Sequence, residues 1–104
     1  MKLAQIAKTI RSKNAGVDKI TFDVIFPDRE SYEMVRRSRA LTRDTVARLY
    51  RIPDERIADF VEFDPGNAIK FTIYRDQPSG SPGDGDIFGA QQYAPLLDLE
   101  IGNR

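Results

Sequence analysis

The residues best suited to chemistry lie in a glycine-rich segment, Pro78-Ser-Gly-Ser-Pro-Gly-Asp-Gly-Asp-Ile-Phe-Gly89. Its glycines permit backbone conformations that other residues reach only at a cost, and they let a ligand or partner chain approach closely. Ser79, Ser81, Asp84 and Asp86 add hydroxyls and carboxylates to this backbone. Long loops without regular structure are usually functional or disordered. We therefore interpret these four residues as contacts for a ligand or a partner.

Two other readings of the same loop are weaker. Asp84 and Asp86 supply hard oxygen ligands, but their spacing does not match a calcium loop and no glutamate follows at the required offset, so no metal is expected. Ser79 or Ser81 could act as a nucleophile paired with Lys13, provided that the fold brings the side chains into contact.

A second polar motif, Arg11-Ser12-Lys13-Asn14, follows a predicted first strand. Two cations and two hydrogen-bonding side chains suit an anion or carboxylate site that faces the glycine-rich loop. The alternative is a polar turn over 12–16, since asparagine and glycine tolerate positive φ. The aspartates of the loop would need cationic neighbours, so we predict that the two motifs lie near one end of the sheet.

The chain has neither histidine nor cysteine. It therefore lacks the usual general base near neutral pH and the commonest metal ligand. A catalytic role would fall to lysine, tyrosine, serine or carboxylate side chains, with Lys13 or Tyr93 as the candidate proton carrier of a hydro-lyase or isomerase. Whether the chain is an enzyme stays open, and no cofactor is predicted.

Length and charge set further bounds. The chain has 104 residues, of which 40% are hydrophobic, and 16 basic residues balance 16 acidic ones. These values predict one globular domain over residues 1–104, with residues 77–89 as its Gly/Pro/Ser-rich loop. Neither nucleic acid nor a membrane is expected as a partner, because the chain has no net positive charge and no long apolar run. The missing cysteines fit a cytoplasmic location.

One local charge excess interrupts this balance, because a single carboxylate, Asp44, lies among six arginines at positions 36, 37, 39, 43, 48 and 51. Such a cluster could bind a phosphate or an acidic partner surface. A solvated helix face, with the arginine stems lying on apolar surface, is the interpretation we favour.

The spacing of apolar residues predicts the helices and strands that must position these side chains. Residues 3–10 fit a helix or a strand, whereas 20–26 alternate as a strand that Pro27 ends. Asp28 caps a predicted helix through Ser38, and Thr42 caps a second helix.

Strands are predicted at 60–63 and 68–74, joined by a type II turn with proline and glycine at its centre. Residues 86–88 are a candidate edge strand, and 91–101 form either a short helix or an irregular segment. The order predicts an α+β sandwich, an antiparallel sheet with helices on one face. We expect a core formed by Phe22, Val24, Phe26, Val46, Leu49, Ile69, Phe71, Ile73 and Leu97.

Nearly the whole chain resembles small bacterial proteins related to the C-terminal ferredoxin-like domain of the acyclic terpene utilisation protein A (AtuA) family. The resemblance rests on Arg11-Ser-Lys-Asn-Ala-Gly16, Leu41-Thr42, Phe63-Asp-Pro-Gly-Asn-Ala-Ile-Lys-Phe71, Pro78-Ser-Gly-Ser-Pro-Gly-Asp84 and Gly89-Ala-Gln-Gln-Tyr-Ala-Pro-Leu-Leu-Asp-Leu-Glu100. In the larger proteins the first motif reads Arg-Ser-Gly-Asp-Lys-Gly. Here Lys13-Asn14 replaces the Gly-Asp pair, which puts any role of that aspartate in doubt.

The resemblance implies a ferredoxin-like fold without an iron–sulfur cluster, and an AtuA-like large protein as partner. It therefore suggests a small accessory or interaction subunit that completes this large protein in the catabolism of carboxylic acids or acyl-CoA. A homo-oligomer is a further assembly to consider. The alternative is a subunit of a hydro-lyase or isomerase that binds a small carboxylate or CoA ester between residues 11–14 and 79–86.

Overall fold

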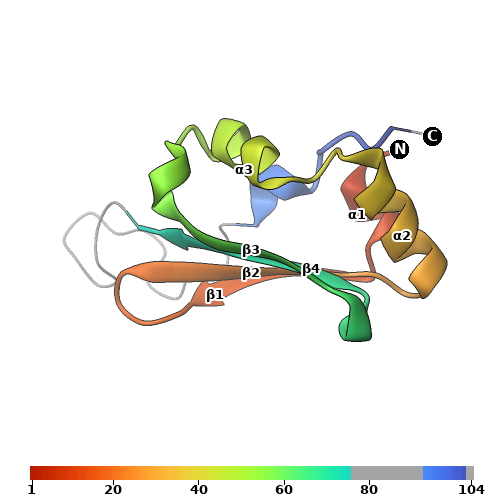
Figure 1. Cartoon of the computed structure of the whole chain (residues 1–104), viewed down its shortest axis with the longest axis horizontal. Coiled ribbons are helices and arrows are strands. Elements are labelled where there is room, and N and C mark those ends of the chain that lie inside the picture. The colour runs from red at the N-terminus through yellow and green to blue at the C-terminus, as the bar shows by residue number, and fades with distance from the viewer. Residues whose placement is uncertain (76–92, 103–104) are drawn as a thin grey trace.

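The protein is an antiparallel sheet covered on one side by helices (Figure 1). A computed structural model describes residues 1–75 and 93–102. The sheet has four strands in the order β1-β2-β4-β3, and the helices and the C-terminal segment lie on the same face of it. The elements are α1 (Leu3–Ile6), β1 (Thr9–Asn14), β2 (Lys19–Ile25), α2 (Arg29–Ser38), α3 (Arg43–Tyr50), β3 (Ile57–Phe63) and β4 (Ala68–Tyr74), with 3-10 turns at Asp54–Arg56, Asp64–Gly66 and Ala94–Leu96.

This architecture confirms the predicted α+β class. Two hairpins, β1–β2 and β3–β4, are joined through α2 and α3, and the central strands β2 and β4 pair antiparallel. A ferredoxin-like unit runs β-α-β-β-α-β along the chain. Here the first two strands, which follow the short α1, form a hairpin with no long helix between them. The order of strands and helices along the chain therefore differs from that of the ferredoxin-like unit.

The caps of both long helices act as the sequence predicted. The Asp28 side chain accepts a hydrogen bond from the Ser31 N–H at 2.8 Å, and the Thr42 hydroxyl accepts one from the Thr45 N–H at 3.2 Å. Each bond satisfies an N–H group that the first helical turn leaves without a partner. Arg39 and Arg51 end the helices in the left-handed conformation, with φ of 61° and 56°.

An aromatic stack spans the covered face of the sheet. Phe71 on β4 stacks on Phe22 of β2, with ring centroids 4.6 Å apart, and Phe60 of the edge strand lies 6.0 Å away on its other side. Tyr50 of α3 contacts Phe22 from above. The rest of the core is aliphatic apart from Phe26 and Tyr32: Leu3, Ile6, Ile20, Val24, Phe26, Tyr32, Val35, Leu41, Val46, Ile57, Ile69, Ile73, Leu96 and Ile101.

The C-terminal segment differs from the expected packing in its details. Leu96 is fully buried whereas Leu97 is only partly buried, because the 3-10 turn at Ala94–Leu96 directs Leu96 inward. Leu49 of α3, also expected in the core, is partly buried as well. The Leu3 N–H donates to the Leu99 carbonyl at 2.8 Å, so this segment is tied to the N-terminus. The two ends of the described chain therefore lie side by side (Figure 1).

The predicted type II turn between β3 and β4 is wrong. Asp64–Gly66 form a 3-10 turn, and Asn67, not Gly66, adopts positive φ, at 49°. Asparagine tolerates this left-handed conformation. At Gly66 a Cβ would come within 2.9 Å of the Phe63 ring, so a side chain there would require this half-exposed ring to move.

Candidate functional site

The motif Arg11–Asn14 lies within β1 and is not a turn. The strand continues through Asn14, and the chain reverses afterwards, where Gly16 has φ of 95°. Because strand side chains alternate between faces, Ser12 and Asn14 point to the helices while Arg11 and Lys13 point to the opposite side. The four residues are therefore divided between the two faces of the sheet, which the turn interpretation did not anticipate.

Arg11 takes part in a cross-strand ion-pair cluster. It lies opposite Asp23, which in turn lies opposite Lys70. Arg11 Nε is 3.0 Å and Lys70 Nζ 3.6 Å from the Asp23 carboxylate, whose side chain is 7% exposed. Two cations thus compensate a buried carboxylate, as burial of a charge requires. Arg11 already has a structural partner, whereas Lys13 is exposed and has no ion-pair partner in the parts of the chain that the structure describes.

A hydrogen bond between Asn14 and Arg75 connects the end of β1 to the residue that follows β4. Arg75 Nη1 donates to Asn14 Oδ1 at 2.8 Å, and the Arg75 N–H donates to the Asp18 carbonyl. The chain therefore enters the segment 76–92 beside the β1–β2 turn. The predicted loop residues Ser79, Ser81, Asp84 and Asp86 lie outside the described residues, as does the predicted strand at 86–88.

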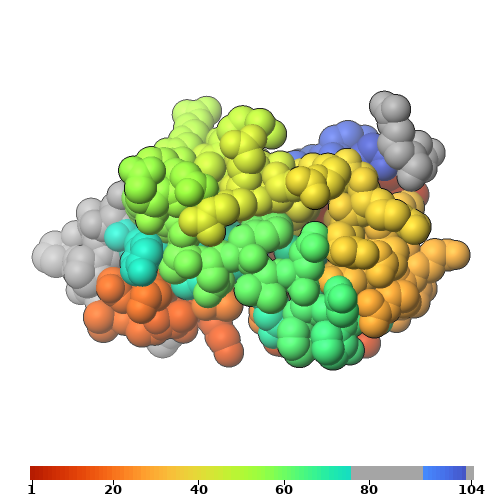
Figure 2. Space-filling model, viewed as in Figure 1, coloured from red at the N-terminus to blue at the C-terminus, as the bar shows by residue number. Residues whose placement is uncertain are grey.

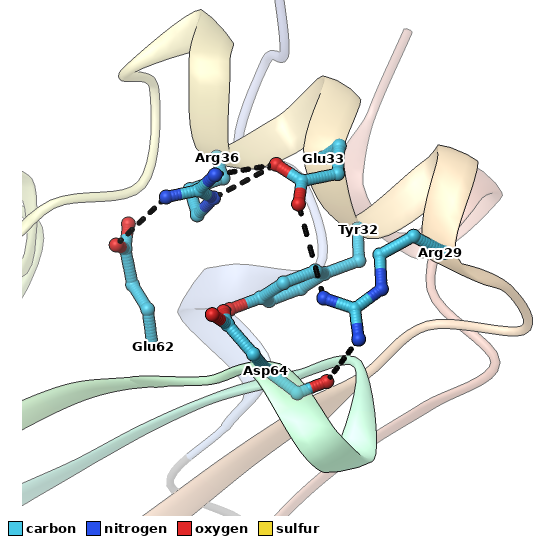
Figure 3. Close-up of polar contacts among 6 residues, drawn as sticks. All are labelled: Arg29, Tyr32, Glu33, Arg36, Glu62 and Asp64. Atoms are coloured by element: carbon cyan, nitrogen blue, oxygen red, sulfur yellow. Dashed lines mark hydrogen bonds and ion pairs between the residues drawn. The ribbon is translucent and has the colours of Figure 1, made fainter.

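A second polar cluster joins α2 to the β3–β4 turn (Figure 3). The buried Tyr32 donates to Asp64 Oδ1 at 2.5 Å, and Arg29 Nη2 donates to the Asp64 carbonyl at 2.9 Å. Glu33 holds Arg36 at 2.6 Å, and Arg36 reaches Glu62 of β3 at 3.8 Å. No local pattern in the sequence indicates this cluster, although Asp64 belongs to the distinctive motif at residues 63–71.

The chemistry of Tyr32 favours a structural role. Burial raises the pKa of Tyr32 well above its usual range, and the hydrogen bond and negative charge of Asp64 raise it further. The phenol therefore stays protonated near neutral pH and serves as a donor, not as a base. Across residues 1–75 and 93–102, no three acidic side chains gather as a metal site would require.

The face of the sheet opposite the helices, here called the outer face, has a mixed composition. Exposed apolar side chains on it are Val61 and Phe63 of β3 and Tyr74 of β4, with exposed fractions of 44%, 43% and 40%. Arginine and lysine side chains from β1, β2 and β4 share it, and its centre holds Asp23 and a Thr21–Thr72 hydroxyl pair at 3.1 Å. No described element packs against this face (Figure 1).

The described helices include none long and apolar enough to cross a membrane.

Comparison with known proteins identifies one family. Neither the curated proteins nor the solved structures include a significant match to this chain. Residues 3–100 match the model of a domain of unknown function, DUF4387. Because this match covers almost the entire domain described above, the chain belongs to the DUF4387 family.

Proposed function

We propose that this protein is a small accessory or interaction subunit that completes an AtuA-like large protein in the catabolism of carboxylic acids or acyl-CoA. The observation that carries the proposal is the outer face, which exposes Val61, Phe63 and Tyr74 on one side of a well-packed sheet. Val61 and Phe63 are neighbours on the same face of β3, and Tyr74 lies at the other end of the face. Exposed apolar side chains that gather beside polar residues are typical of protein interaction sites. The motif resemblance to the AtuA C-terminal domain supports the choice of partner.

The charges of the outer face favour a different protein over a second copy as the partner. Its cations are Arg11, Lys13, Lys19 and Lys70, and its carboxylates are Asp23 and Asp59. Two such faces brought together would oppose like charges, which costs free energy at an interface. A partner surface with acidic groups opposite these cations and apolar groups opposite Val61 and Phe63 would instead be complementary. We therefore expect the large protein to supply this acidic surface, whether or not the chain also forms homo-oligomers.

Exchanging Val61 for glutamate tests this interface. Val61→Glu places an anion in the apolar part of the outer face, and we expect the recovery of an AtuA-like large protein with the tagged chain to fall at least tenfold. Val17→Glu is the matched control, because Val17 is also exposed, at 65%, but lies in the β1–β2 turn. Co-expression followed by affinity purification measures both. Failure of the wild-type chain to retain any AtuA-like protein, or equal losses for the two variants, would contradict the proposal.

The second candidate is the enzyme subunit, with Lys13 or Tyr93 as proton carrier and residues 11–14 and 79–86 around a carboxylate or CoA ester. The uncompensated charge of Lys13 favours it, as does the Asn14–Arg75 contact at the entry to the segment 76–92. We expect Lys13→Ala to abolish any dehydration or isomerisation of small carboxylic acids or their CoA esters, without changing the melting temperature. Activity unchanged in Lys13→Ala would remove Lys13 from the reaction, and Tyr93→Phe would then test the other carrier.

A further inference from the structure

The edge strand β3 presents a free backbone edge. Within residues 1–75 and 93–102, β3 pairs with β4 alone, and Figure 2 shows the strand at the surface below the α2–α3 segment. The pairing is irregular only between Ile57 and Asp59, and Arg43 Nη2 already donates to the Ile57 carbonyl at 2.7 Å. The regular stretch from Asp59 to Phe63 is therefore the part of the edge that can accept another strand.

A groove of about 450 Å³ runs beside this edge, lined by Arg39, Thr42, Arg43, Asp44, Phe60 and Glu62. Its floor is the Phe60 ring, which continues the aromatic stack of the core. Its roof is the segment that links α2 to α3. Backbone groups along an edge strand and a pocket beside alternate side chains are the two features by which sheets bind extended peptides.

The groove is lined by two arginines and two carboxylates, and three of these four charged residues form ion pairs within the described chain. Asp54 holds Arg43 at 2.8 Å, Arg48 holds Asp44 at 2.7 Å, and Arg36 lies 3.8 Å from Glu62. Arg39, by contrast, is exposed and has no ion-pair partner in the described parts of the chain. A ligand side chain that enters the groove therefore meets a guanidinium whose charge is not yet compensated.

We infer that β3 and this groove bind an extended acidic segment of a partner protein by strand addition. Alternate side chains of the added strand point to opposite faces of the sheet. Those on the helix side enter the groove, where a carboxylate pairs with Arg39. Those on the other side extend the outer face beside Val61 and Phe63, where apolar side chains are favoured. The occupant is thus a strand that alternates acidic and apolar residues.

The edge also has features that limit unspecific pairing. Asp59 and Glu62 place negative charge along β3, and charged residues and bulges are common means of keeping exposed edges from aggregating. Arg29 and Arg36 together compensate Glu33 and Glu62, whereas Asp59 has no ion-pair partner in the described parts of the chain. Asp59 is therefore the carboxylate that an acidic ligand must avoid. Asp59 points to the outer face, opposite to the groove, so an acidic side chain directed at Arg39 does not meet it. The charge pattern therefore selects the orientation of the added strand.

A blocked octapeptide of alternating glutamate and valine is the probe for this inference. We expect it to bind the full chain and to shift the backbone amide resonances of Asp59–Phe63 in a ¹H–¹⁵N titration, with affinity that falls as salt increases. The same peptide with alternate backbone nitrogens methylated cannot form the strand ladder, and we expect it to bind at least tenfold more weakly. A lysine–valine octapeptide should not bind.

Arg39→Asn removes the charge and keeps a residue that tolerates positive φ. We expect the affinity for the glutamate–valine peptide to fall about fivefold, as for the loss of one partly exposed ion pair. Arg51→Asn is the matched control, because Arg51 is exposed and also ends its helix with positive φ, but it does not line the groove. We expect its affinity to match the wild type within twofold.

Three outcomes would overturn the inference: no binding of the glutamate–valine peptide at millimolar concentration, equal binding of its methylated form, or equal losses for the two asparagine variants. β3 and the groove by themselves define the chemistry of the added strand, whether or not the partner is the AtuA-like protein. If that protein fails to co-purify while the peptide binds, the proposed partner is wrong and the docking site remains.

Discussion

Replacing Phe71 with alanine is expected to destabilise the domain by about 3–5 kcal/mol, the usual cost of removing a large buried aromatic side chain. Phe71 is 0% exposed and lies between Phe22 and Phe60 in the aromatic stack. Its loss would leave a cavity bordered by three strands, since Phe22, Phe71 and Phe60 belong to β2, β4 and β3. A small domain is stable by only about 5–15 kcal/mol, so the change removes a large part of that margin.

Urea unfolding of the two proteins measures the difference in the free energy of unfolding. Phe63→Ala is the matched control, because Phe63 is on the outer face of β3 and 43% exposed. We expect it to cost less than 1.5 kcal/mol, as for a residue that is still half in water. An unchanged stability of Phe71→Ala would show that the two faces of the sheet are inverted.

The second large effect is expected from Tyr32→Phe. The substitution removes the hydroxyl that donates to Asp64 at 2.5 Å, and the Arg29 bond to the Asp64 carbonyl still connects α2 to the β3–β4 turn. A hydrogen bond to a charged group contributes about 1.5–3 kcal/mol, and we expect a loss of stability of this size at pH 7. Tyr74→Phe is the control, because Tyr74 has an exposed side chain with no hydrogen bond to lose in the described structure.

The burial of Tyr32 should also make the free energy of unfolding depend on pH in the alkaline range. The folded protein raises the pKa of Tyr32, mainly through burial, and burial raises the pKa of Tyr50 as well. A tyrosine in the unfolded chain titrates near pH 10, so above that pH the unfolded state loses protons that the folded state retains. The contribution of each tyrosine to stability is therefore complete below about pH 10 and decreases by about 1.4 kcal/mol per pH unit above it.

Denaturation followed by circular dichroism from pH 8 to 12 tests this linkage. Wild type should lose stability steeply above about pH 10, and Tyr32→Phe should lose it with a smaller slope because only Tyr50 still contributes. Identical slopes for wild type and Tyr32→Phe would show that Tyr32 titrates as it does in water.

Local signals in the sequence predicted the helices and strands well. Asp28 and Thr42 cap the helices that they were expected to cap, and the alternation of Phe22, Val24 and Phe26 gives the buried face of β2. These features depend on hydrogen bonds within one turn or on the two-residue period of a strand. Neighbouring residues alone determine them.

The errors arise where distant segments compete with local preference. The type II signature at 64–67 yields to a 3-10 turn, in which the Asp64 carboxylate accepts from Tyr32 on α2. The polar stretch Ser12–Asn14 reads as a turn in isolation, yet pairing with β2 extends the strand through it. The choice of Leu96 over Leu97 as core residue likewise depends on the turn that directs it under α3.

The sequence by itself determined the fold class, the helix caps, the covered face of the sheet and the absence of histidine and cysteine chemistry, because each follows from composition or short-range periodicity. Only the tertiary structure decided that Arg11 and Lys13 lie on the outer face while Ser12 and Asn14 face the helices. It also decided that Tyr32 donates to Asp64 and that Arg39 lies beside the edge of β3. Those relations join residues from different strands and helices. Their physical cause is strand register and helix packing, which no local pattern encodes.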